Sequence, residues 1–175
     1  MRRGFTLVEI LMVVVILGIA GAIIVPQIST RDDMRAAAAA RMLMADLIYS
    51  QNLAITSSAN CYIKFDTVNQ KYSVMDSGLT VVQHPVNHTA YDVQFASSTN
   101  KSLQQMSIDS ASLVGASGTA KNYLGFDDLG TPLAYDGSGS PETLTTGSIV
   151  LKCGTYKMKV DIEPYTGQIS VTSIN

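Results

Sequence analysis

The chain has 175 residues, with 12 Lys and Arg, 14 Asp and Glu, and a formal charge of −2. This length leaves room for one globular domain beyond an anchoring helix. The charge balance excludes the broad basic surface that nucleic-acid binding needs, so we predict no nucleic-acid partner. Charged side chains are only 15% of the residues, and the abundance of Ser, Thr, Asn, Gln and Gly is typical of a β-rich extracytoplasmic domain.

The most apolar stretch is residues 1–28, MRRGFTLVEILMVVVILGIAGAIIVPQI. Glu9 is the only charged residue of 5–28, so about 24 residues predict a helix of about 36 Å that crosses a bilayer. Arg2 and Arg3 favour a cytoplasmic amino terminus. A cleaved secretory signal is the competing interpretation, but the apolar run continues past the small residues where such a signal would end. A carboxylate within a membrane span costs about 2.5–3.5 kcal/mol, so Glu9 needs a partner.

The segment Gly4-Phe5-Thr6-Leu7-Val8-Glu9 resembles the class III signal of type IV prepilins and type II secretion pseudopilins. The resemblance implies that a prepilin peptidase cleaves between Gly4 and Phe5 and that the new Phe5 amine is methylated. It also implies that Glu9 pairs with the amino terminus of a neighbouring subunit in a filament. A lone acid in hydrocarbon gains a cation when another subunit brings one, which fits this role.

Beyond the apolar run, the sequence predicts that the helix continues to about residue 57. Pro26 removes a helical hydrogen bond, so we expect a kink there, as the resemblance to pilins also implies. Polar and apolar residues then alternate with helical periodicity, which predicts an amphipathic helix packed on a globular head. The predicted organisation is a leader at 1–4, a transmembrane and assembly half at 5–28, an amphipathic half at 29–57 and a head at 58–175.

After residue 58 the periodicity changes from helical to alternating, which predicts an antiparallel sheet or sandwich covered on one face by the helix. The fold class is therefore α+β. The expected strands are 61–66, 71–75, 79–83, 91–96, 105–108, 122–126, 148–153, 156–162 and 168–172. Residues 130–147 are rich in turn-forming residues and predict an exposed loop.

Two cysteines, Cys61 and Cys153, lie far apart in the sequence. Outside the cytoplasm a disulfide between them would contribute about 4–5 kcal/mol by the chain-entropy model. The alternative is that each is a small buried residue. The sequence leaves the two interpretations open.

Nothing in the sequence indicates an enzyme. His84 and His88 are four residues apart, but a proline between them disfavours a helix and no acid or Cys motif accompanies them. Asp127, Asp128 and Asp136 lie beside glycines without EF-hand spacing, so turn formation is preferred over Ca²⁺ binding. We expect no catalytic residues, metal site or cofactor.

The carboxyl-terminal third carries a second resemblance. Segments 126–130 (FDDLG), 147–151 (GSIVL), 159–162 (KVDI) and 166–171 (TGQISV) resemble the GspH/FimT group of minor pseudopilins, in which a Phe-x-x-x-Gly turn precedes two paired strands and a Thr-Gly hairpin. The resemblance implies a non-enzymatic subunit of the type II secretion pseudopilus. Its location would be the bacterial inner membrane, single-pass, with the head in the periplasm and other pilins or pseudopilins as partners.

The alternative function is a FimT-like minor pilin of a type IV pilus, acting in pilus assembly or DNA uptake. FimT-like DNA binders resemble each other in an Arg-rich carboxyl-terminal segment, whereas residues 167–175 contain no basic residue. A phosphate-binding surface needs several cations at physiological salt. Type II secretion is therefore the preferred function.

Overall fold

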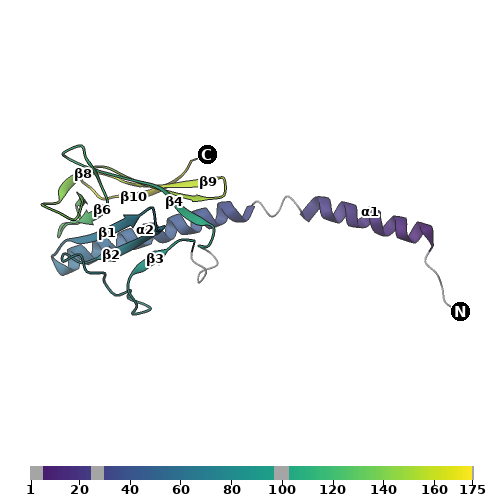
Figure 1. Ribbon diagram of the computed structural model, residues 1–175, viewed down its shortest axis with the longest axis horizontal. Coiled ribbons are helices and arrows are strands. Elements are labelled where there is room, and N and C mark those ends of the chain that lie inside the picture. The colour runs from purple at the N-terminus through teal and green to yellow at the C-terminus, as the bar shows by residue number, and fades with distance from the viewer. Residues whose placement is uncertain (1–5, 25–29, 97–102, 175) are drawn as a thin grey trace.

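Two helices begin the chain in the computed structural model, which describes residues 6–24, 30–96 and 103–174. They are α1, Leu7–Ile24, and α2, Thr30–Ser57 (Figure 1). The sequence predicted one helix over this whole length. The join between the two helices, with the kink predicted at Pro26, lies outside the described residues, as do Gly4 and Phe5.

The helix α2 packs one face against the head. Its buried residues recur at steps of three and four, which places them on one side of a helix. They are Ala36, Ala39, Ala40, Leu43, Leu47, Ser50 and Ala54. Small alanines in the first half allow a close approach to the sheet, while the two leucines are 1% and 0% exposed. The predicted amphipathic character of this half is confirmed.

Within the described residues, ten antiparallel strands form the head. Eight follow the order β10-β9-β8-β7-β6-β1-β2-β3, while β4 pairs with β8 and β5. The strands are β1 Cys61–Asp66, β2 Lys71–Met75, β3 Asp92–Gln94, β4 Met106–Gly115, β5 Ala120–Lys121, β6 Tyr123–Phe126, β7 Pro132–Tyr135, β8 Glu142–Cys153, β9 Tyr156–Ile162 and β10 Ile169–Ile174. This arrangement of a helix on an antiparallel sheet confirms the predicted α+β class (Figure 1).

The long strand β8 connects the two parts of the sheet. Its first residues, Glu142 and Thr143, pair with β7. From Gly147 to its end it runs between β4 and β9. The strand β8 therefore changes neighbours along its length. It joins the part of the sheet that contains the β1–β2 hairpin to the part that contains the β9–β10 hairpin.

The prediction of an exposed loop at 130–147 is wrong. The structure places β7 and the first half of β8 there, and only the Ser- and Gly-rich centre forms a turn. Pro132 and Ala134 are buried and alternate with less buried neighbours, which is the strand period. The predicted strand at 79–83 is also wrong, because this stretch makes only isolated bridges, Met75 with Val81 and Gln83 with Ala90.

Candidate functional site: assembly helix and head

The start of α1 is held by Thr6 and Glu9. The Thr6 amide and hydroxyl both donate to Glu9 Oε2, at 2.8 and 2.9 Å, and the Glu9 amide donates to Thr6 Oγ1 at 3.3 Å. This reciprocal pair is a capping box, which satisfies amides that the first helical turn leaves free. The carboxylate predicted to act in assembly therefore also stabilises the beginning of its own helix.

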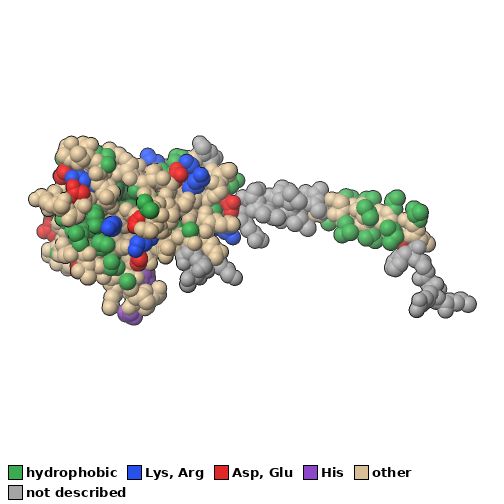
Figure 2. All heavy atoms as spheres, viewed as in Figure 1, with side chains coloured by type: hydrophobic (Ala, Val, Ile, Leu, Met, Phe, Trp, Pro, Cys, Tyr) green, Lys and Arg blue, Asp and Glu red, His purple; other side chains and the backbone are tan. Residues whose placement is uncertain are grey.

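The surface of α1 is apolar all round. Every large hydrophobic side chain from Leu7 to Ile19 is at least 52% exposed, and Figure 2 shows hydrophobic side chains along the helix. A helix of this kind has no preferred polar face and needs an apolar environment. By length and hydropathy together, none of the helices in the described part of the chain qualifies as a membrane span.

The two cysteines do not form a disulfide in this structure. Both are free and buried. Cys61 interacts with Ser50, whereas Cys153 interacts with Asp32. Since 18 residues of helix separate these two contacts, they are about 27 Å apart along α2, far beyond the reach of a disulfide. Burial raises the pKa of the Cys61 thiol to about 11, so this group is unreactive at neutral pH.

A carboxylate on α2 ties the β2–β3 region to the helix. Asp46 accepts hydrogen bonds from the hydroxyls of Tyr72 and Tyr91, and the His84 ring lies 4.4 Å from the Tyr91 ring between centroids. Burial raises the pKa of Asp46, although both tyrosines and His84 act in the opposite direction. A hydrogen-bonded carboxylate at this position fixes the register between helix and sheet.

The raised pKa of Asp46 predicts a pH-dependent contribution to stability. The folded state holds the Asp46 proton more tightly than the unfolded chain, so this contribution is complete below about pH 3.9 and is lost as pH rises through the folded pKa. The quantity to measure is the difference in free energy of unfolding between the wild type and Asp46→Asn. We expect this difference, wild type minus variant, to fall as pH rises through the folded pKa. Urea unfolding between pH 3 and 8 measures it, and a difference that rises with pH would contradict the assignment.

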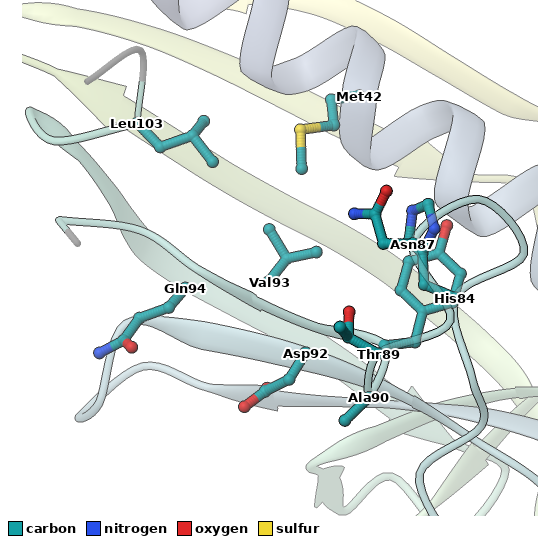
Figure 3. A pocket seen from close by; sticks show the side chains of 10 residues that line it. Met42, His84, Asn87, Thr89, Ala90, Asp92, Val93, Gln94 and Leu103 are labelled. Atoms are coloured by element: carbon teal, nitrogen blue, oxygen red, sulfur yellow. The ribbon is translucent and has the colours of Figure 1, made fainter. Parts of the chain in front are cut away.

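The same region of the head carries a hollow beside α2. It has a volume of about 440 Å³ and lies between Met42 of α2 and the segment around His84 and Val93 (Figure 3). His88 does not line it. No group of three or more His, Cys, Asp or Glu that could hold a metal occurs among the described residues.

The aspartates considered for Ca²⁺ have turn functions where the structure describes them. Asp127 Oδ1 accepts from the amides of Leu129 and Thr131, at 3.0 and 2.7 Å. Asp136 accepts from the Ser138 amide at 3.0 Å and pairs with a lysine. These bonds use the oxygens to close turns.

Residues 1–25 match the model of the prokaryotic N-terminal methylation motif. The fold is similar to that of the minor pseudopilin EpsH from the type 2 secretion system of Vibrio cholerae, with a TM-score of 0.52 and 10% identity over 79% of this chain and 97% of that chain. The chain carries a prepilin-type methylation motif on a pseudopilin fold. No curated protein matches it with significant sequence similarity.

The pseudopilin fold brings together two turns that lie far apart in the sequence, the Phe-x-x-x-Gly turn at 126–130 and the Thr-Gly turn at 163–167. We call them the two glycine turns. The Gln51 side chain donates to the Gly130 carbonyl at 2.9 Å. A Cβ placed on Gly167 would lie 2.6 Å from Gln51 Nε2 and 2.9 Å from that same carbonyl oxygen. The Phe-x-x-x-Gly turn and the Thr-Gly hairpin therefore meet on one residue of α2.

Two structural features of the assembly helix and the head were not predicted from the sequence. The capping box had a readable signal, since Thr6 and Glu9 have the spacing of the motif and precede an apolar run. Gln51 had none, because its importance comes from two turns that lie 79 or more residues further along the chain.

Proposed function

We propose that this chain is a minor pseudopilin of a type II secretion system, a non-enzymatic subunit of a periplasmic filament that acts in protein export across the outer membrane. The observation that carries the proposal is the joining of the methylation motif at residues 1–25 to a pseudopilin fold. A prepilin peptidase would cleave between Gly4 and Phe5 and Phe5 would be methylated. Residues 5–28 would anchor the chain in the inner membrane, with the head in the periplasm.

The exposed surface of α1 supports assembly with other pilins. Apolar side chains on all sides can face lipid before assembly and neighbouring helices afterwards. The transfer therefore needs no refolding of the head, which has its own core.

The geometry of Glu9 supports a specific contact in this assembly. Both Thr6 donors bond to Oε2, so among the described residues Oε1 is left without a partner. We infer that Oε1 accepts from the methylated Phe5 amine of a neighbouring subunit while Oε2 keeps the helix cap. One carboxylate would then stabilise the helix start and pair two subunits.

Deleting the gene in its host tests the type II assignment. We expect exoproteins to accumulate in the periplasm instead of the medium, because an incomplete pseudopilus cannot export them, while transformation and surface motility stay unchanged. Quantitative immunoblots of both fractions measure the first result, and complementation with the wild-type gene is the control. Normal secretion with lost motility or transformation would move the chain to a type IV pilus.

A further inference from the structure

Four large apolar side chains are exposed near the carboxyl-terminal end of α2 and on the two glycine turns. Ile48 and Ile55 lie on one face of the helix and are 39% and 45% exposed, while Leu129 and Tyr165 are 82% and 74% exposed. We call these four residues the distal patch. Leu129 and Tyr165 stand on turns and do not contribute to the core. Clustered exposed apolar side chains of this kind indicate an interaction surface.

The turns hold the distal patch together. Gly130, the residue after Leu129, approaches Ile55 so closely that a Cβ on it would lie 3.0 Å from Ile55 Cδ1. Gly167, two residues after Tyr165, packs against Gly130 and Gln51. The helix and both turns therefore form one surface near the carboxyl-terminal end of α2. This surface lies about 35 Å along the helix axis from the start of α2.

The rim of the distal patch is acidic. Asp128 precedes Leu129, Glu163 precedes Tyr165 by two residues, and both side chains are exposed. In the described parts of the chain, neither carboxylate forms an ion pair. An apolar centre with an unpaired acidic rim is complementary to an apolar segment flanked by Lys or Arg.

We propose that the distal patch docks a second, different protein through an apolar segment flanked by basic residues. A second copy of this chain fits less well, because most of its described cations are already engaged. Arg35, Lys71, Lys121, Lys157 and Lys159 form ion pairs, and Lys64 lies over the Tyr123 ring. Among the residues that the structure describes, Arg41 and Lys152 have neither contact, but they lie far apart in the sequence and do not flank one apolar segment. Nucleic acid and anionic lipid are repelled by the acidic rim. This contact is separate from assembly through α1.

Photocrosslinking of the full chain in its host tests the proposal. The probe is p-benzoylphenylalanine placed at Leu129 or Tyr165, with Val68 as the control position, since Val68 is 88% exposed on the β1–β2 turn away from the patch. We expect both patch positions to crosslink to the same different protein at least fivefold above the Val68 yield. Mass spectrometry of the crosslinked peptide should find Lys or Arg beside the apolar contact residue.

A charge change separates docking from folding. Asp128→Lys combined with Glu163→Lys should reduce the crosslink yield at Leu129 at least fivefold, while the melting temperature stays within about 2 °C because both side chains are exposed. Yields equal to those at Val68 overturn the proposal. So do crosslinks to lipid or to a second copy, a target peptide without a basic residue, or a yield that the charge change leaves intact.

Discussion

Glu9→Gln should abolish incorporation of the subunit into filaments while leaving the head folded. Glutamine can still close a capping box, so the start of α1 keeps its hydrogen bonds. The substitution removes the negative charge that we propose to pair with a neighbouring Phe5 amine. Breaking a buried ion pair costs about 3–5 kcal/mol, which corresponds to a loss of more than 100-fold in the affinity between subunits.

The matched control is Thr6→Ala, which keeps the charge and removes one side of the capping box. It should weaken the helix start by about 1 kcal/mol and leave incorporation within about twofold of wild type. Immunoblots of filaments released from the periplasm of cells that also make the wild-type partner subunits measure both variants. If Glu9→Gln assembles normally and Thr6→Ala does not, capping is the function of Glu9 and the intersubunit pair is wrong.

The fold was predictable where one local period controls a segment. The strands β1, β2 and β9 lie at the predicted residues. Apolar and polar residues alternate along β9, whereas β1 and β2 each bury three consecutive residues and were located by the polar turn between them. The apolar residues at helical spacing in α2 predicted its packing on the head, and Leu43, Leu47 and Ala54 are buried there. Ile48 and Ile55 share that spacing but are 39% and 45% exposed, so the pattern placed the buried face only in part.

Prediction failed where non-local pairing decides. Turn-forming residues made 130–147 resemble a loop, but pairing of β7 with β6 and of β8 with β4 and β9 extends the backbone there. This pairing cannot be read from spacing along the chain, because partner strands supply the energy. The sequence left the state of Cys61 and Cys153 open, and the structure decides it because the two thiols contact residues far apart on α2.

Gly167→Ala should be the most destabilising single-methyl change among the glycine turns. The residue has φ of 67°, a conformation that costs an L-residue about 1–2 kcal/mol. The added Cβ would also lie 2.9 Å from the Gly130 carbonyl oxygen, so backbone must shift and the bond from Gln51 must lengthen. We expect the free energy of unfolding to fall by about 2–4 kcal/mol in total.

Gly139→Ala separates the two contributions to this loss. Gly139 has φ of 73°, close to that of Gly167, but a Cβ there would meet nothing within 4 Å. This control carries the conformational cost alone, about 1–2 kcal/mol. Urea unfolding of both variants in the same detergent gives the difference between them. Equal losses would mean that the contact of the two turns on Gln51 does not constrain the head, whereas a larger loss at Gly167 makes this contact the reason that a glycine is needed there.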